Sequence, residues 1–290
     1  MLDQLTIYFY ESPNAYITFV FLISLLIGSF LNVVIYRVPI MMKHEWGRDA
    51  AEYFEDTEEM AKLEKMETFN LVKPDSTCPK CSHKILAWEN IPVISWIYLK
   101  GKCSGCKASI SARYPIIEVS VALLSAIVAW KYGFTAQGLF LICLSWALFA
   151  LAVIDYDTLL LPDTITLPLV WIGLVLNWQG FIVDLPDALF GAVAAYVSLF
   201  SITWIHSAIT GRVGMGNGDF KLFAAFGAWF GWLALLPIII FSCAFVIIYA
   251  VYSMAILSRT SQDPMPFGPS MCAACMTYIV FGNNFHMLYY

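Results

Sequence analysis

Long apolar runs alternate with short polar segments along most of this chain. One bilayer crossing takes about 20 apolar residues. The pattern predicts eight crossings, near residues 15–36, 115–132, 137–155, 164–180, 187–209, 220–236, 237–258 and 268–288. Residues 220–258 would form a helix of about 58 Å if unbroken, so we expect two helices there, with a turn between Gly231 and Pro237. The prediction is an all-α polytopic membrane protein, with seven helices as the alternative count.

Composition supports this fold class, because 60% of the residues are hydrophobic and only 13% are charged. Most of the charge lies in one block. We therefore expect three parts: a first transmembrane helix over residues 1–36, a polar loop domain over residues 37–113, and a membrane-embedded core over residues 114–290. The net charge of −5 says little about partners when the charge is so unevenly placed. The lipid bilayer is the expected surroundings, and no nucleic-acid partner is expected.

The distribution of basic residues predicts how the chain is oriented in the membrane. With eight crossings, every Lys and Arg except Lys131 falls on one side. Loops rich in Lys and Arg stay in the cytoplasm. The polar loop should therefore be cytoplasmic, and the loops that carry Asp155 and Asp219 should open to the same side.

Two Cys-x-x-Cys motifs lie within the polar loop, at Cys78 with Cys81 and at Cys103 with Cys106. This spacing is typical of a tetrahedral four-cysteine zinc site, which is structural because it leaves no ligand position open. Two disulfides or free thiols are the alternatives. A cytoplasmic loop lies in a reducing compartment, which argues against disulfides.

Two acidic residues at the ends of apolar runs are the strongest functional signal. Asp155 closes one run, and Asp219 opens another. Ionisable groups at membrane depth are costly and usually functional. Two carboxylates that share a site divide the roles of base and acid, as hydrolysis of a peptide bond requires. Helix capping by Asp219 and a proton relay within a transporter are the alternatives.

Residues next to the two acids are expected to support the site. Gly216 and Gly218 would let a substrate backbone approach and let the chain turn into the helix that Asp219 opens. Asp163 follows Pro162 and is placed to cap a helix N-terminus, with a supporting polar role as the alternative. Lys221, two residues after Asp219, is the nearby cation.

The chain resembles the type IV prepilin leader peptidases over essentially its whole length. The resemblance rests on residues 28–37, the paired cysteine motifs, residues 113–118, Asp155 through Asp163, residues 216–221 and the run Pro264–Pro269. Gly-x-Gly-Asp alone would also fit presenilin-type intramembrane proteases. The ordered set is far more specific than any one motif.

The resemblance implies a bifunctional enzyme of the bacterial inner membrane. Members cleave the leader of type IV prepilins and type II secretion pseudopilins after a Gly on the cytoplasmic face, and then methylate the new N-terminus with S-adenosylmethionine. By similarity, Asp155 and Asp219 are the catalytic acids. The methyl-donor site is associated with the cytoplasmic loop, where Gly101 is a candidate, although it also fits a simple turn residue.

Two rival interpretations come from other functional classes. A proton-coupled carrier would use the acids as a relay and would have repeats or broken helices at mid-membrane. A structural assembly scaffold anchored by the zinc module would tolerate replacement of both acids.

Overall fold

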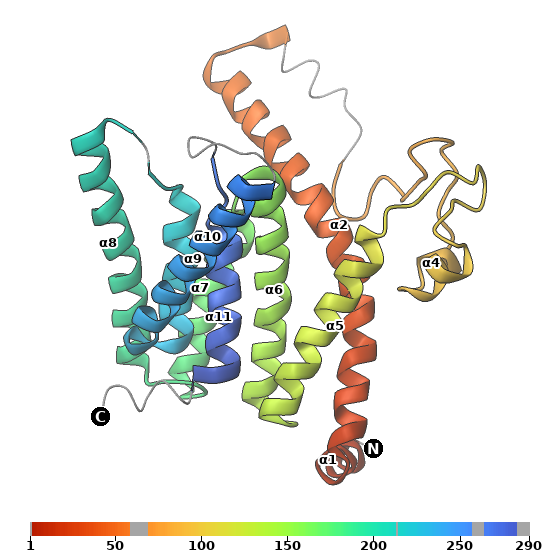
Figure 1. The fold of residues 1–290 in the computed structure, drawn as a ribbon, viewed down its shortest axis with the longest axis horizontal. Helices are drawn as coiled ribbons and strands as arrows, with labels where there is room; N and C mark the ends of the chain where they lie inside the picture. The colour runs from red at the N-terminus through yellow and green to blue at the C-terminus, as the bar shows by residue number, and fades with distance from the viewer. Residues whose placement is uncertain (1, 59–68, 213, 257–263, 283–290) are drawn as a thin grey trace. The chain divides into compact units, whose positions relative to one another are not determined.

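The computed structural model describes residues 2–58, 69–212, 214–256 and 264–282, and these residues form helices and loops without a β-strand (Figure 1). This confirms the all-α prediction. In chain order the helices are α1 (Leu2–Glu11), α2 (Pro13–Tyr53), η1 (Ala87–Asn90), α4 (Ile94–Tyr98), α5 (Arg113–Tyr132), α6 (Ala136–Thr158), α7 (Asp163–Trp178), α8 (Leu185–Thr210), α9 (Asn217–Phe230), η2 (Trp232–Ala234), α10 (Leu235–Ile256) and α11 (Gly268–Phe281).

Several of these helices are suited to crossing a membrane. Five segments within the described ranges are long and apolar enough: α2, α5, α6, α8 and Trp232–Ile256. The helices α7 and α11 are apolar but shorter. With its 14 residues, α9 is only about 21 Å long, less than the bilayer core of about 30 Å. The chain is thus a multi-pass membrane protein, but the expected count of eight crossings is not confirmed.

The predicted break in the apolar stretch 220–258 is confirmed. The helix α9 ends at Phe230, and Gly231 follows with a φ of 74°. Glycine adopts this left-handed conformation without the steric cost that a side chain brings. One turn of 3-10 helix, η2, then leads into α10.

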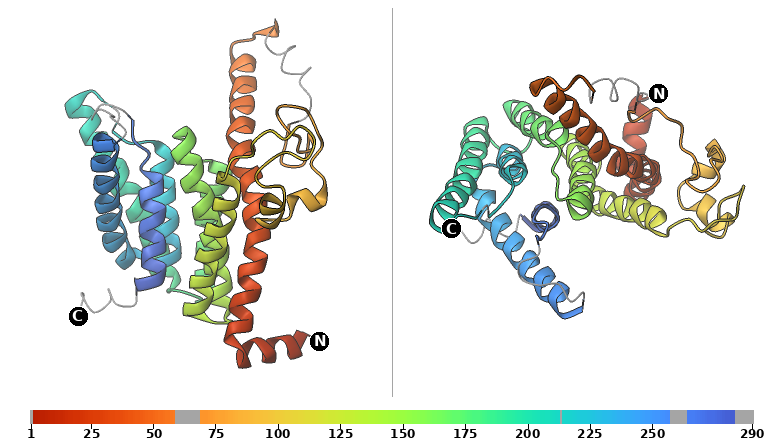
Figure 2. Two further views of the ribbon diagram at one scale, coloured as in Figure 1. Left: turned by 45° about the vertical axis from the view of Figure 1, so that its right-hand side comes forward. Right: turned by 90° about the horizontal axis from the view of Figure 1, so that it is seen from above.

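The first long helix differs from its prediction in length. The expected crossing ended at residue 36, whereas α2 runs for 41 residues and includes Pro39. The apolar pattern ends near residue 36, but residues 43–53 contain Lys, Glu, Arg and Ala, which are good helix formers and are solvated easily. The helix therefore continues as a polar extension, which Figures 1 and 2 show projecting past the start of α5.

The chain divides into two compact units, residues 1–130 and 131–290. We call residues 69–112, between the described end of the α2 region and α5, the polar segment. In the N-terminal unit, Arg37 holds this segment against α2. Its buried guanidinium donates to the carbonyl oxygens of Asn70 and Pro74, at 2.8 and 2.7 Å, and lies over the ring of Phe69. These charge-assisted bonds fix the point at which the polar segment returns to the helix.

The C-terminal unit is built around α9, most of whose residues are buried. On one side, Trp229 donates its indole N–H to the carbonyl of Leu169 in α7 at 2.8 Å. On the other side, the ring of Phe220 meets the rings of Tyr196 and Phe200 in α8, edge to face. The helix that carries Asp219 is therefore fixed by neighbours along its length.

Candidate functional site

Asp155 lies in the last turn of α6 with its side chain turned into the protein. The residue is 6% exposed, and its Oδ2 accepts a hydrogen bond from the backbone N–H of Gly268 at 2.9 Å. Gly268 is the first residue of α11. The C-terminal end of a helix is an unfavourable place for negative charge. Asp155 is thus held at an energetically costly position by a helix more than 100 residues away in the sequence.

Asp219 lies in the first turn of α9. The residue is 8% exposed, and its carboxylate accepts a hydrogen bond from the backbone of Gly216, the residue that caps α9. Phe220 and Leu222, one and three residues further along α9, are also buried. Asp219 therefore belongs to the interior of the C-terminal unit and is more than a solvated cap.

The structure brings the two acids together. In the C-terminal unit, α6 ends where α9 and α11 begin (Figure 1). The charge of Asp155 acts on Asp219, and both acids act on the buried thiol of Cys272, one turn into α11. Three helix ends thus meet around a pair of buried carboxylates. Such a pair, titrating as a unit, can activate a water and protonate a leaving group.

Gly268 is a component of the site that the sequence analysis did not single out. A Cβ atom at this position would lie 2.7 Å from Oδ2 of Asp155, closer than any side chain tolerates. The signal in the sequence was its place in the run Pro264–Pro269, one of the segments on which the family resemblance rests.

The two glycines before Asp219 have different surroundings from those expected. Neither has a positive φ. A Cβ on Gly218 would lie 2.7 Å from Cβ of Leu161, whereas one on Gly216 would make an ordinary contact of 3.6 Å with Asp219. Gly218 thus permits close packing of α9 against the loop after α6. Exposure of a substrate backbone at these glycines stays a prediction.

The prediction that Asp163 caps a helix is wrong. Pro162 takes the capping position of α7, and Asp163 is the first residue inside the helix. Both carboxylate oxygens of Asp163 accept from Nζ of Lys221, at 2.8 and 2.6 Å. A charged ammonium is a stronger donor than a neutral backbone N–H. This ion pair ties the start of α7 to α9, the helix that carries Asp219.

The four cysteines of the polar loop form one cluster. Their Sγ atoms all lie within 4.8 Å of one another, and two pairs, Cys78 with Cys106 and Cys81 with Cys103, are 3.9 Å apart. A tetrahedral zinc with Zn–S bonds of about 2.3 Å places its sulfurs about 3.8 Å apart. The cysteines are free thiols, without disulfides. The cluster therefore has the ligand set and spacing of a metal site.

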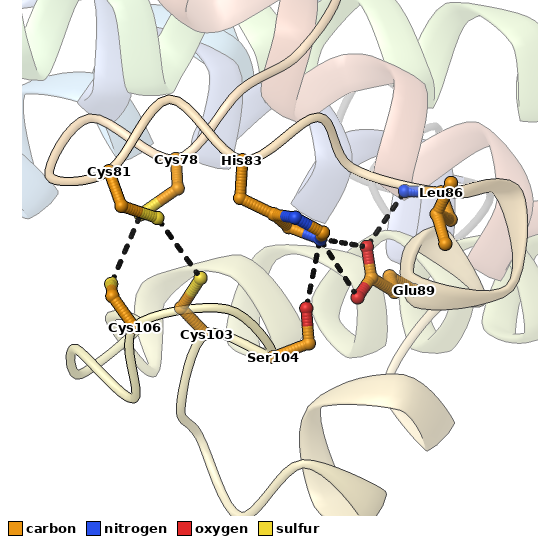
Figure 3. A network of polar contacts seen from close by, with 8 residues as sticks. All are labelled: Cys78, Cys81, His83, Leu86, Glu89, Cys103, Ser104 and Cys106. Carbon is orange, nitrogen blue, oxygen red and sulfur yellow. Dashed lines mark hydrogen bonds and ion pairs between the residues drawn. The ribbon is translucent and has the colours of Figure 1, made fainter.

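The two cysteine motifs have the same backbone geometry. The N–H of each first cysteine, Cys78 and Cys103, donates to the carbonyl five residues later. A residue with positive φ follows each second cysteine, namely Ser82 and Lys107. Each motif is a tight knuckle that turns both of its thiols toward the other knuckle (Figure 3).

The backbone of these knuckles favours thiolates. N–H groups of Lys80 and Cys81 lower the pKa of Cys78 to about 7, and the N–H of Cys106 lowers the pKa of Cys103. The backbone N–H of His83 lowers the pKa of Cys81. Hydrogen bonds with the thiols of Cys106 and Cys78, together with burial, more than offset this effect and raise the pKa of Cys81 to about 12. A bound cation would offset the repulsion between neighbouring thiolates.

A second polar network adjoins the cysteine cluster (Figure 3). Nε2 of His83 lies 2.9 Å from Oγ of Ser104 and 3.2 Å from Oε2 of Glu89. Glu89 also accepts the N–H of Leu86 at 2.8 Å. Hydrogen bonds from Ser104 and Leu86 hold the pKa of Glu89 below its usual value. This network links one knuckle to the other, and the sequence analysis missed it.

Gly101 is explained by its backbone and packing. Its φ is 64°, and a Cβ would lie 2.9 Å from the ring of Trp96. Its N–H and carbonyl bond to Trp96 and Ile110. These observations favour the turn interpretation, and the described part of the polar segment offers no feature that identifies a methyl-donor pocket.

Comparisons with known proteins cover nearly the whole chain. Residues 22–132 match the bacterial peptidase A24 N-terminal domain, and residues 142–251 match the type IV leader peptidase family. Prepilin leader peptidase/N-methyltransferases are similar: that of Stutzerimonas stutzeri is 45% identical over 94% of this chain and 93% of its own length. Those of Pseudomonas aeruginosa and Neisseria gonorrhoeae are each 44% identical, over 97% and 90% of this chain and 96% and 88% of their own lengths. No solved structure is significantly similar.

Proposed function

Because the chain belongs to the type IV leader peptidase family, we propose that it removes the leader of type IV prepilins and type II secretion pseudopilins and then methylates the new N-terminus. The observation that carries the proposal is the meeting of Asp155 and Asp219, two buried carboxylates from distant helices, at one end of the C-terminal unit. The relatives' names give both activities to one chain.

Asp155 and Asp219 act as one catalytic unit. One carboxylate, ionised, takes a proton from a water whose oxygen attacks the carbonyl carbon of the scissile bond after Gly. The other, protonated, donates a hydrogen bond to the carbonyl oxygen and then a proton to the leaving amine. The pair ends the cycle with one proton between them, so the two acids exchange roles and titrate jointly. Gly268 holds one oxygen of Asp155 through its N–H, which leaves the other oxygen available for the water.

Supporting residues keep the pair aligned. The ion pair between Lys221 and Asp163 joins α9, which carries Asp219, to the start of α7, and Gly218 lets α9 pack closely against the loop between α6 and α7. The substrate's apolar N-terminal helix lies in the membrane beside these spans, with its leader on the cytoplasmic side of the inner membrane. The basic residues favour this orientation, because they gather on the side of the polar segment.

The four cysteines hold one structural zinc ion. The spacing of their sulfurs fits a zinc–tetrathiolate, and so does the lowering of the pKa of Cys78 and of Cys103. Four protein ligands leave no position for substrate, so the zinc orders the polar segment and takes no part in hydrolysis. S-adenosylmethionine supplies the methyl group, and no residue described here is assigned to bind it.

The test is incubation of the purified full-length protein with a prepilin and S-adenosylmethionine, followed by mass analysis of the pilin N-terminus. We expect leader loss and one methyl group. Asp155→Asn and Asp219→Asn should each abolish cleavage, whereas Asp157→Asn, an exposed residue half a turn beyond Asp155, should retain it. Cleavage near the wild-type rate in either of the first two variants would support a scaffold or carrier instead.

A further inference from the structure

An exposed apolar cluster lies on the polar segment of the N-terminal unit, outside the candidate site. It consists of Trp88, Ile91, Ile94, Ile97 and Tyr98, from η1, the residue that follows it, and α4. Their exposed fractions run from 44% for Trp88 and Ile91 to 76% for Tyr98. The rings of Trp88 and Tyr98 lie edge to face, 6.3 Å between centroids. We call these five residues the α4 face. Contiguous exposed apolar residues of this kind mark a binding surface.

A hydrogen bond sets the depth of the α4 face. The N–H of Val93, the residue before α4, donates to Oε2 of Glu118 at 2.7 Å. Glu118 is buried, and the hydroxyl of Ser29 in α2 bonds to it as well. Both Glu118 and Ser29 belong to helices that are long and apolar enough to span a membrane. The start of α4 is therefore fastened to two membrane helices.

The depth can be estimated along α5. Its 20 residues measure about 30 Å, which is the full thickness of a bilayer core. Glu118 is the sixth residue of α5, so α4 begins about 7.5 Å inside the end of that span. Figures 1 and 2 show α4 beside the upper part of α5 and not beyond its end. Interfacial helices bury their apolar faces about 5–10 Å into the headgroup boundary, which matches this depth.

The charge around the α4 face fits an anionic lipid surface. Residues 76–117 contain one acidic residue, Glu89, and six basic ones, of which Lys84 is paired with Asp75: Lys80, Lys84, Lys100, Lys102, Lys107 and Arg113. The Glu89 side chain is only 6% exposed and is engaged with His83. Lys100 and Lys102, directly after α4, are exposed. Trp and Tyr are enriched where a membrane meets water, and anionic lipids attract nearby Lys residues.

We propose that the α4 face inserts at the boundary between headgroups and acyl chains of the membrane that the chain spans, and that Lys100 and Lys102 bind anionic phospholipid headgroups there. The polar segment is then held to the membrane surface at η1–α4 as well as at its two ends. This docking does not depend on the catalytic assignment. A substrate helix is the other conceivable occupant, but the depth and the basic flank favour lipid.

Photo-crosslinking tests the proposal in the full-length protein. Benzoylphenylalanine replaces Tyr98 in one variant and Ile97 in a second, and the protein is reconstituted in vesicles of phosphatidylethanolamine and phosphatidylglycerol without substrate. Tyr53, the last residue of α2, is the control, because it is aromatic like Tyr98, 82% exposed and about 24 Å along α2 beyond Arg37, the residue that follows the expected first crossing. After irradiation, intact mass analysis measures covalent phospholipid adducts.

We expect phospholipid adducts at positions 98 and 97 and none at position 53. Lys100→Gln with Lys102→Gln should lower the share of phosphatidylglycerol among those adducts. Absence of lipid adducts at both test positions, or equal yields at position 53, would overturn the proposal. So would an adduct that forms only with added prepilin, which would make the α4 face a peptide-binding surface. Retention of bound metal in each variant shows that the segment is folded.

Discussion

Replacement of Gly268 by alanine is the sharpest test of how the acidic site is built. The added Cβ would lie 2.7 Å from Oδ2 and 3.1 Å from Cγ of Asp155. Carbon atoms in contact prefer about 3.5–4.0 Å, so the carboxylate must retreat by roughly 0.5 Å or more. Gly268 does not need a left-handed φ, and alanine is the better helix former. The strain therefore falls on the carboxylate and not on the backbone.

The size of the effect follows from the hydrogen bond that this shift disturbs. Gly268 N–H donates to Oδ2 of Asp155 at 2.9 Å, and a hydrogen bond to a charged group contributes about 1.5–3 kcal/mol. Loss of that amount from the transition state lowers the rate about 10- to 150-fold. A misplacement of about 1 Å can cost a similar factor. We expect leader cleavage to fall about 100-fold in Gly268→Ala.

The assay measures kcat/KM for release of the leader from a purified prepilin by the full-length protein in lipid vesicles. Gly47→Ala is the matched control, because a Cβ at Gly47 in α2 meets nothing within 4 Å. Metal content of the cysteine cluster and methylation of a pilin already lacking its leader are measured in parallel. Both should stay at wild-type levels in Gly268→Ala.

Two results would refute the reasoning. Wild-type cleavage by Gly268→Ala would mean that Asp155 is not positioned by the N-terminus of α11 during the reaction. Joint loss of cleavage, methylation and metal would mean that the substitution unfolds the protein, so that the close contact reports packing alone.

Three further predictions concern the residues around the two sites. Lys221→Met should lower the free energy of unfolding by no more than about 1 kcal/mol, because its ion pair with Asp163 is partly exposed, and Lys221→Arg should restore it; thermal unfolding checks both. Cys106→Ser should lose the zinc and make the polar segment sensitive to protease, whereas Cys243→Ser in α10 keeps full metal content by elemental analysis. His83→Ala should weaken zinc binding about 10-fold in competition with a chelator, because partners around the ligands hold them in place; unchanged affinity would show that the Glu89 network is dispensable.

The sequence predicted best where local spacing decides the structure. Two residues between paired cysteines allow a tight knuckle, so the clustering of Cys78 and Cys81 with the second pair follows from the sequence alone. Hydrophobic run lengths predicted the helices, and Gly231 was available as the turn residue that a 39-residue apolar stretch requires. These features depend on neighbours in the chain and are readable from them.

What the sequence did not reveal depends on contacts between distant segments. Asp163 has the local context of a helix cap, and only the packing of α7 against α9 brings Lys221 to it. Nothing near Gly268 indicates that its N–H reaches Asp155 across more than 100 residues. His83 and Glu89 lie six residues apart without a motif, and Ser104 completes their network only after the two knuckles meet.

The depth of the two acids bears on the choice between hydrolysis and proton transport. Asp155 and Asp219 each lie within one turn of a helix end, about 5 Å from the loops. Hydrolysis requires water, which is available at helix ends, and a substrate whose leader remains in the cytoplasm meets the enzyme there. A relay requires titratable groups along the membrane interior. Residues 138–154 of α6 contain no acidic or basic side chain, so this helix offers no path inward from Asp155. The placement of the pair therefore favours attack on a peptide bond at the membrane surface.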